Sequence, residues 1–371
     1  MHTILRCVIP ECEGDSEIQF DAIDRELMLP TDSQCRRFTP LSAVDANASA
    51  LYCLREHYHQ TDTTQCHDFV YRTMDTIFAE FGLACREWLR TLVGTVRNSA
   101  LPLALVLTGY VSDRWGRRTA FCIFSGFAGV LGVIKGFSIN YNMYLSFEFL
   151  EAALGYGFNS AGYVMAVELA RPSLRPAFAC ATGVSYGLGG MLFALVAWKV
   201  PHWRRLLWTI HTPALLLPFY WLLLDESPRW LHARGRLQEA SAVIKKAARW
   251  NKIVVNDDIM RGFENRMHSV EGKSEANPWL SLLKSRALMA RFALCCWCWA
   301  ATTFVYYGLT INSVSLSGDK YANFALNMAM EVVASLLLVM SLERFGRKRS
   351  LFVAFVLCGV VCVVPYLLSD R

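Results

Sequence analysis

The stretch "GYVSDRWGRR", Gly109–Arg118, places one acid and three bases within six positions: Asp113, Arg114, Arg117 and Arg118. Apolar sequence leads into it ("ALPLALVLT") and away from it ("AFCIFSGFAGVLGVI"). A similar pattern returns in "SLERFGRK", Ser341–Lys348, again between apolar segments. The sequence therefore predicts pairs of long apolar helices that are joined by short, strongly charged loops.

The composition is that of a polytopic membrane protein. Hydrophobic residues make up 54% of the 371 positions and charged residues only 18%, where soluble domains carry about a quarter. About eight blocks approach the roughly 20 residues that cross a bilayer as a helix. They are Trp88–Tyr110, Thr119–Phe137, Met143–Val167, Phe178–Val200, Leu206–Leu224, Leu288–Ile311, Phe324–Leu342 and Leu351–Leu368. A soluble core of eight such helices is implausible. A barrel is excluded because the blocks do not alternate apolar and polar residues. We expect an all-α membrane protein.

The charge distribution predicts the orientation. Residues 1–86 contain no Lys, seven Arg and fourteen Asp or Glu, and the rest of the chain carries the excess of bases. Because the bases lie in short loops between the blocks, the positive-inside rule explains them better than nucleic-acid binding does. Basic loops at 114–118, 171–175, 225–287 and 344–349 are therefore expected inside, and residues 1–87 outside. Lys199, Arg204 and Arg205 disagree with this rule, because they would lie outside.

The first 87 residues have the features of an extracellular loop. They contain six cysteines, an even number that suits disulfides in an oxidising compartment, although the sequence leaves their pairing open. These are Cys7, Cys12, Cys35, Cys53, Cys66 and Cys85. The chain's one glycosylation sequon, at Asn47, falls in the same segment. We expect a glycosylated, disulfide-bonded outer loop.

No metal or other cofactor is expected. Cys295-Cys296-Trp297-Cys298 lies in an apolar block with no histidine or acid at ligand spacing. The inner segment 225–287 contains an amphipathic helix at Leu237–Asn251. This helix is expected either on the inner leaflet or packed beneath the spans.

The two charged loops form a repeat. Asp113 and Glu343 lie 230 positions apart, so the loop recurs once in six spans, which is typical of two parallel six-helix halves. Glycine lets chain segments approach closely, and the charges can pair at inner helix ends in one conformation and separate in another. The predicted conformational network comprises Gly109, Asp113, Arg114, Gly116, Arg117, Arg118, Glu168, Glu226, Arg229, Glu343, Arg344, Gly346 and Arg347.

"GYVSDRWGRR" and "ERFGRK" resemble the paired signature loops of the major facilitator superfamily. "DESPRWL" (Asp225–Leu231) and the cysteine-rich loop are similar to its organic cation, anion and carnitine transporters. The resemblance implies about twelve spans in two halves, of which this chain would hold helices two to nine. It would lack helix one and helices ten to twelve. A genuine eight-span protein is the alternative.

The resemblance also implies a substrate site between the halves. Glu331 looks like the helix-eight acid of the cation transporters, and Trp299 and Tyr306 resemble their helix-seven cavity aromatics. An acid beside aromatic rings suits an organic ammonium ion, although the two rings could simply pack. Asn98 and Tyr163 are further candidates.

Helix four departs from the family. The family usually has an arginine there, whereas this chain has Glu148 and then Glu151, and an unusual Arg97 lies in the first span. We expect an intramembrane ion pair of Arg97 with Glu148 or Glu151. Alternatively, the acids titrate and couple protons.

The sequence argues against a hydrolase and against a channel. Gly183–Gly187 ("GVSYG") matches a hydrolase pattern but lies in an apolar span, where small residues serve helix packing. A channel would need a filter or pore ring, and none is evident. The expected protein is a multi-pass carrier of the plasma membrane with four segments: outer loop 1–87, spans 88–224, inner loop 225–287 and spans 288–371. Its expected partners are the lipid bilayer and small organic cations or zwitterions, with organic anions or a transport-incompetent truncated protein as alternatives.

Overall fold

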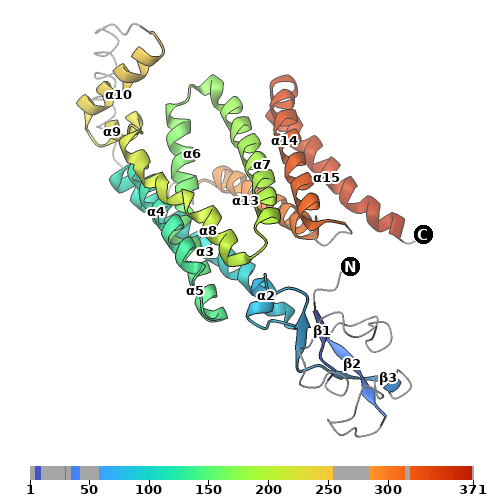
Figure 1. The fold of residues 1–371 in the computed structure, drawn as a ribbon. Coiled ribbons are helices and arrows are strands. Elements are labelled where there is room, and N and C mark those ends of the chain that lie inside the picture. Colours follow the sequence, from blue (N-terminus) through green and yellow to red (C-terminus); the bar gives the residue numbers. More distant parts are fainter. Residues whose placement is uncertain are drawn as a thin grey trace. The chain divides into compact units, whose positions relative to one another are not determined.

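The computed structural model describes residues 5–9, 30, 35–41, 58–253, 284–313 and 318–369, and Figure 1 labels its elements. The longer helices are α3 (Glu87–Trp115), α4 (Arg117–Lys135), α5 (Tyr141–Gly155), α6 (Gly157–Leu169), α7 (Arg175–Lys199), α10 (Leu237–Trp250), α13 (Arg286–Ser313), α14 (Lys320–Phe345) and α15 (Arg347–Ser369). The short ones are α2 (Ile77–Glu80), η3 (Pro172–Leu174), α8 (Trp203–His211), η4 (Pro213–Leu222) and α9 (Pro228–Ala233).

The chain divides into two compact units. Unit 1 comprises Met1–Val111, Ala120–Ser160 and Val200–Leu222, and unit 2 comprises Ser112–Thr119, Ala161–Lys199 and Leu223–Arg371. The boundaries fall inside α3 and α4, so the charged turn between these helices belongs to unit 2 while most of both helices belongs to unit 1.

The cysteine-rich segment adds short strands to an otherwise helical protein. β1 (Leu5–Cys7) pairs antiparallel with β4 (Phe69–Tyr71), and β2 (Arg36–Pro40) with β3 (Tyr58–Gln65). Disulfides join Cys7 to Cys66 and Cys35 to Cys85, which resolves part of the pairing that the sequence left open. Cys12, Cys53 and the sequon at Asn47 lie outside the described residues.

Among the described residues, five helices are long and apolar enough to cross a membrane by length and composition: those at Glu87–Trp115, Arg117–Lys135, Pro172–Lys199, Arg286–Ile311 and Lys320–Leu342. Two of the predicted continuous spans are broken. Met143–Val167 is divided between α5 and α6 at Tyr156, and Leu206–Leu224 between α8 and the 3-10 segment η4. Pro213 and Pro218 cause the second break, because proline offers no amide hydrogen to the helix ladder.

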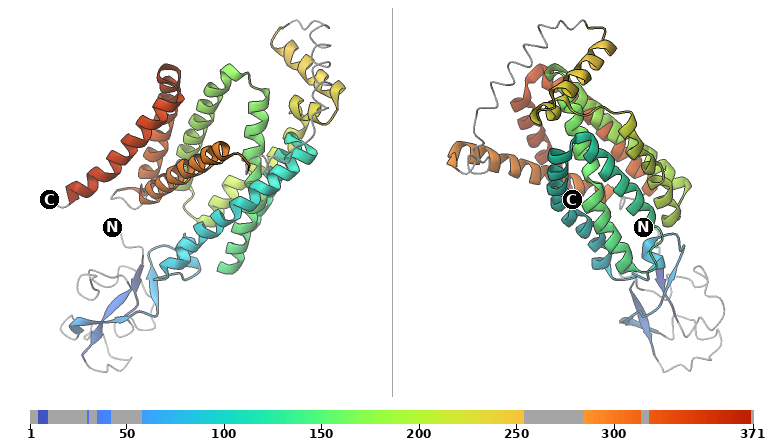
Figure 2. Two further views of the ribbon diagram at one scale, coloured as in Figure 1. Left: turned by 180° about the vertical axis from the view of Figure 1, so that it is seen from behind. Right: turned by 90° about the vertical axis from the view of Figure 1, so that its left-hand side faces the viewer.

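Small residues bring the helices of unit 1 together. Ala100 of α3 is fully buried in a cluster with Ala152 and Ala153 of α5, and α3 and α5 lie near one another in both views of Figure 2. A Cβ at Gly155 would lie only 2.9 Å from Ala128 Cα of α4. This glycine beside Tyr156 keeps α4 close and weakens the helix at its break.

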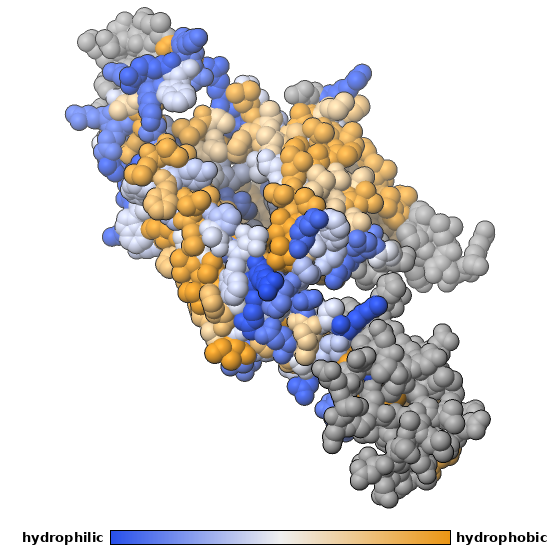
Figure 3. Space-filling view, viewed as in Figure 1, coloured by the Kyte–Doolittle hydropathy of each residue, from blue (hydrophilic) through white to orange (hydrophobic). Residues whose placement is uncertain are grey.

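Unit 2 contains the α7–α14 pair, which forms its most extensive helix contact. Three glycines of α7, Gly183, Gly187 and Gly190, face Ser335, Val332 and Met328 of α14 at distances that leave no room for a Cβ. The "GVSYG" pattern is therefore a helix-packing surface. Hydrophobic residues cover α14 in Figure 3, whereas hydrophilic residues gather over α9 and α10.

The predicted amphipathic helix forms as α10. Its Ala240 is fully buried against Trp230 and Leu231 of α9, with Val243 packed on the same cluster. Part of its apolar face is therefore occupied by α9, a helix of the same inner segment, and its place on the inner leaflet or beneath the spans stays a prediction.

Candidate functional site

The charged turn of unit 2 is built around Gly116. This residue links α3 to α4 with a backbone φ of +103°, a conformation that side chains with a Cβ rarely adopt. A Cβ on Gly116 would also overlap the carboxylate of Glu226, whose Cδ lies 2.8 Å from that position. Glycine is therefore required here for two independent reasons.

Glu226 caps the N-terminus of α4 from a distant part of the chain. Its Oε1 accepts the backbone amides of Arg117 at 2.9 Å, Arg118 at 3.2 Å and Ser227 at 2.8 Å. The residue is only 8% exposed. Free amides and the helix dipole make a helix N-terminus a favourable place for a buried carboxylate.

Arg117 ties the same turn to α6. Its guanidinium donates to Ser112 O at 2.9 Å and to Asp113 Oδ1 at 3.0 Å, and its Nε lies 3.4 Å from Glu168 Oε2. Ser227 donates a short hydrogen bond to the same Glu168 oxygen. The structure thus brings together most acids and bases that the sequence assigned to the first copy of the network.

α9 satisfies the C-terminal end of α3. Trp230 Nε1 donates to Asp113 O at 2.8 Å, and Arg234 Nη2 donates to Asp113 O at 2.8 Å and to Arg114 O at 3.2 Å. These carbonyls belong to the last helical turn, where no intrahelical donor remains. The Asp113 carboxylate itself is 77% exposed.

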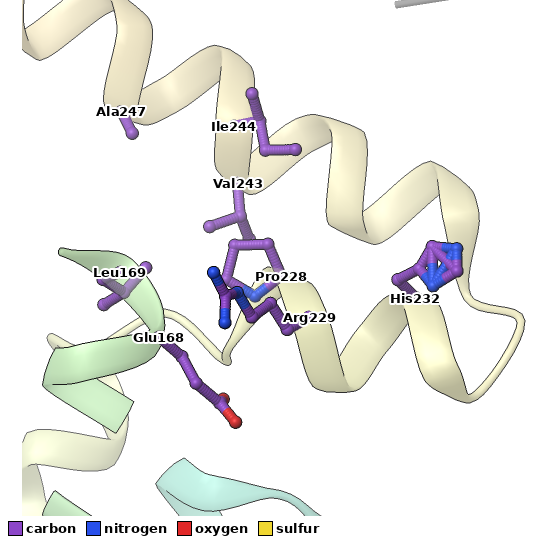
Figure 4. Close-up of a pocket in the computed structure, with 8 residues that line it drawn as sticks. All are labelled: Glu168, Leu169, Pro228, Arg229, His232, Val243, Ile244 and Ala247. Carbon is purple, nitrogen blue, oxygen red and sulfur yellow. The ribbon is translucent and has the colours of Figure 1, made fainter. Parts of the chain in front are cut away.

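Arg229 takes a different position from the one expected. Together with Glu168, it lines a cavity of about 400 Å³ between α6, α9 and α10, and apolar side chains such as Val243 and Ile244 complete the lining. In Figure 4 the Glu168 carboxylate points away from the Arg229 guanidinium. Gly109 also differs, since no described atom lies within 4 Å of a Cβ placed on it.

The second charged loop has a glycine with a positive φ like the first loop. Within the described residues, a carboxylate cap like that of Glu226 is seen only at the first loop. Gly346 has a φ of +77° and separates α14 from α15, as Gly116 separates α3 from α4. Within the described residues, nothing lies within 4 Å of a Cβ on Gly346. Glu343 and Arg344 fall in the last turn of α14, and Arg347 begins α15. The backbone repeat is therefore clear, while the acid cap is seen at the first copy.

A cluster of tyrosines and one acid lies elsewhere in unit 2. The Tyr306 hydroxyl of α13 is 3.4 Å from the Tyr186 hydroxyl of α7, and the Tyr307 ring lies 5.5 Å from the Tyr306 ring. Glu331, on α14, lies within electrostatic range of Tyr306, whereas the direct contact is the one between Tyr306 and Tyr186.

The other predicted substrate residues are Trp299 and Tyr163, in unit 2, and Asn98, in unit 1. Trp299 is 75% exposed, and no contact joins it to Glu331 in the described part of unit 2. Asn98 donates to Gly94 O of its own helix at 2.8 Å, and the ring of Tyr163 packs on Phe178 with centroids 5.6 Å apart.

Unit 1 contains a buried charge cluster. Arg97 Nη1 lies 2.7 Å from Glu148 Oε1 and 3.4 Å from Glu151 Oε1. Lys135 Nζ lies 2.9 Å from Glu148 Oε2 and forms a shorter contact with Glu151 Oε2. His211 Nε2 is 3.7 Å from Glu151 Oε1. The arginine and both acids of the predicted ion pair therefore lie together, with Lys135 and His211 added.

A separate ion pair involves Arg204, one of the basic residues that disagree with the predicted orientation. Arg204 at the start of α8 forms a close, multiply hydrogen-bonded pair with Glu80 of α2. It also donates to Gly136 O and Ser138 O, each at 2.8 Å, just beyond α4. The hydrogen bonds from Arg204 lower the pKa of Glu80 below its usual range. Because Arg204 is bound to protein partners, it is weak evidence about which side of the membrane its loop faces.

Three participants were missed from the sequence. Lys135 closes an apolar block and resembles a flanking anchor. His211 is a single histidine within an apolar block, and Tyr186 stands inside the glycine-rich stretch that indicated only packing. The Gly183–Gly187 spacing could have suggested that its neighbour Tyr186 lies near a second helix.

The sequence matches the family described as "Sugar (and other) transporter" over residues 56–369. Among curated relatives, a beta-alanine transporter of Drosophila melanogaster is 31% identical over 325 residues, which is 84% of this chain and 54% of the relative. Organic cation/carnitine transporter 2 of Rattus norvegicus is 27% identical over 384 residues, which is 99% of this chain and 67% of the relative. The chain thus spans between about half and two thirds of the length of these relatives.

A solved structure shares the fold. The major facilitator superfamily proton:xylose symporter XylE, bound to 6-bromo-6-deoxy-D-glucose, aligns with a TM-score of 0.59 at 20% identity, covering 74% of this chain and 64% of the symporter. This likeness agrees with the fold that the charged loops predicted. The chain belongs to the sugar (and other) transporter family of the major facilitator superfamily.

Proposed function

We propose that this chain belongs to a carrier of small organic cations or zwitterions and supplies the carboxylate that binds their cationic nitrogen. The observation that carries this proposal is the cluster of Glu331, Tyr306 and Tyr186 in unit 2. A carboxylate far from water is costly unless a cation or hydrogen-bond donors accompany it. Tyrosine rings beside it add attraction for an ammonium group.

The cationic character of the substrate follows from the charge of α14. Between Lys320 and Arg344 this helix contains no lysine or arginine, and its two acids are Glu331, in the middle of the helix, and Glu343, beside Arg344. An organic anion would lack a basic partner on that stretch. The relatives are named for β-alanine, organic cations and carnitine, and each of these substrate classes has a positively charged nitrogen. The proposed site uses that shared group.

The proposed mechanism is alternating access between two halves. The network around Glu226 joins α3, α4, α6 and α9 through main-chain and side-chain bonds, so it can hold one conformation and release it when these bonds break. We place residues 1–87 outside the plasma membrane and 225–287 inside, with spans at 88–224 and 288–371. The disulfides Cys7–Cys66 and Cys35–Cys85 support the outer assignment, because disulfides persist in oxidising compartments.

Equilibrium binding of radiolabelled tetraethylammonium to the purified full chain in lipid nanodiscs tests the site. Glu331→Gln is expected to weaken binding at least tenfold, because an intramembrane cation loses its counter-charge. Glu239→Gln is the matched control, since Glu239 is exposed on α10 and pairs only locally with Arg236. Equal binding by the two variants would refute the assignment of Glu331. Binding of an organic sulfonate in place of tetraethylammonium would favour the anion alternative.

A further inference from the structure

We propose that His211 and Glu151 form a proton-binding site within the buried charge cluster of unit 1. The ligand is a single proton, held between His211 Nε2 and Glu151 Oε1, which lie 3.7 Å apart. The proposal goes beyond the organic-ion site, which lies in unit 2 and requires none of these residues. It also assigns a group, the imidazole, that the acids alone did not suggest.

The tautomer of the imidazole follows from its other nitrogen. His211 Nδ1 lies 2.8 Å from the carbonyl oxygen of Leu207, one turn earlier in α8. A carbonyl oxygen only accepts hydrogen bonds, so Nδ1 must carry the hydrogen. In the neutral ring Nε2 then carries a lone pair, and that lone pair faces the Glu151 carboxylate. Two acceptors that face each other leave a place for one proton.

The carboxylate has an oxygen available for this proton. Glu151 Oε2 is engaged by Lys135, the closest contact of the cluster. Among the described residues, Oε1 has the longer contact to Arg97 Nη1, at 3.4 Å. A protonated Nε2 would therefore give Oε1 a second charge-assisted donor, which neutral His211 cannot supply.

The surrounding charges balance before the proton arrives. Arg97 of α3 and Lys135 of α4 offset Glu148 and Glu151 of α5, and the Tyr144 ring lies 5.9 Å from Lys135 Nζ. On α8 itself, Arg204 is paired with Glu80. With neutral His211 the cluster contains two cations and two carboxylates, and proton binding adds one positive charge beside Glu151.

The ring is held in place, and one side of the cluster is open. A Cβ at Gly132 of α4 would overlap the His211 imidazole, so glycine leaves the space that the ring occupies. The side chains of Glu151 and His211 are 8% and 14% exposed, whereas Arg97 is 43% exposed. Arg97 therefore gives the cluster its contact with the surface of the unit.

Solid-state NMR of the full chain in bilayers tests the site without any transport assay. Ile210-His211 is the only Ile-His pair in the sequence and Pro201-His202 the only Pro-His pair, so carbonyl labelling of Ile or Pro together with labelled His identifies each ring. We expect neutral His211 with hydrogen on Nδ1, and conversion to the imidazolium between about pH 8 and pH 5. His202 is the internal control, because its Nδ1 accepts the Arg204 amide at 3.3 Å and its hydrogen must lie on Nε2.

Two results would overturn the proposal in the unaltered protein: hydrogen on Nε2 of neutral His211, or a ring that stays neutral down to about pH 5. Glu151→Gln adds a second test. It should keep the Nδ1 hydrogen, because Leu207 is unchanged, and reduce the share of imidazolium measured at one fixed pH, because the carboxylate no longer accompanies the charge. An equal share of imidazolium in both proteins would exclude Glu151 as the partner. Since no organic ion is present, these results are independent of the proposed carrier function.

Discussion

Glu226 caps a helix that begins 109 positions earlier in the chain, with its Oε1 2.9 Å from the backbone nitrogen of Arg117. The contact joins the turn between α3 and α4 to the segment that precedes α9. It uses main-chain amides, which remain available whatever side chain follows Gly116. The cap therefore depends on the carboxylate and on the space left by glycine.

Alanine at the two repeated glycines should have unequal effects. Gly116→Ala and Gly346→Ala both force a Cβ into a positive φ, which costs about 1 kcal/mol. Only at Gly116 does the Cβ also collide with Glu226, so that variant should lose a further ~1–3 kcal/mol. Thermal denaturation in detergent micelles measures the difference. Equal losses would show that the Glu226 cap contributes little.

Charge reversal tests the cluster in unit 1. Glu148→Arg places a third cation beside Arg97 and Lys135 and should sharply reduce the yield of folded protein, because unpaired charge in the membrane is costly. Adding Arg97→Glu restores two cations and two acids, and should recover part of the yield measured by size-exclusion chromatography. A double variant no better than Glu148→Arg would mean that Arg97 and Glu148 do not pair.

Two glycines of α7 allow a matched test of the packing between α7 and α14. A Cβ at Gly187 would lie 2.6 Å from Val332 Cγ2 and 2.8 Å from Met328 O, whereas a Cβ at Gly189 meets no described atom within 4 Å. Gly187→Ala should therefore destabilise the protein by about 1–3 kcal/mol. Gly189→Ala should be neutral or slightly stabilising, because alanine is the better helix former. The reverse order in a melting experiment would contradict this helix contact.

The pairing of Glu80 with Arg204 should give a pH-dependent stability. Because the pKa of Glu80 is lowered in the folded protein, its contribution is present above the ordinary carboxyl range, about pH 4–5, and is lost as pH falls through the lowered value. The melting temperature of the unaltered protein should exceed that of Glu80→Gln at neutral pH, and the gap should close under acid. Glu87→Gln, an exposed acid at the start of α3, is the control and should show no such gap.

The sequence was sufficient for the membrane class, the repeat and the superfamily. Long apolar blocks and two charged loops can be recognised from composition and spacing alone, without knowing how the helices pack. The helix breaks at Tyr156 and before Pro213 were not anticipated. Mean hydropathy shows neither where a helix loses a hydrogen-bond donor nor where it packs closely against another helix. The strands in the cysteine-rich segment were hidden because their residues give little alternation.

The sites were predicted in part for a similar reason. Arg97, Glu148 and Glu151 were identified because charge in an apolar block is conspicuous. Lys135 at a block end has an ordinary explanation as an anchor, and one histidine in α8 gives no pattern. How Lys135 and His211 come to lie beside the two acids depends on the packing of α4, α5 and α8. The pattern of residues along a single helix does not predict that packing. The same holds for Tyr186 of α7, whose contact with Tyr306 depends on how α7 and α13 pack.

Counterflow in proteoliposomes tests the carrier proposal most directly. Vesicles containing the full chain are preloaded with unlabelled tetraethylammonium, and uptake of a trace of labelled tetraethylammonium is followed with and without Glu331→Gln. The account predicts a transient, saturable overshoot of label inside the vesicles in the unaltered protein, and none in the variant. An unsaturable leak without overshoot would contradict alternating access, and an equal overshoot in the variant would contradict the role of Glu331.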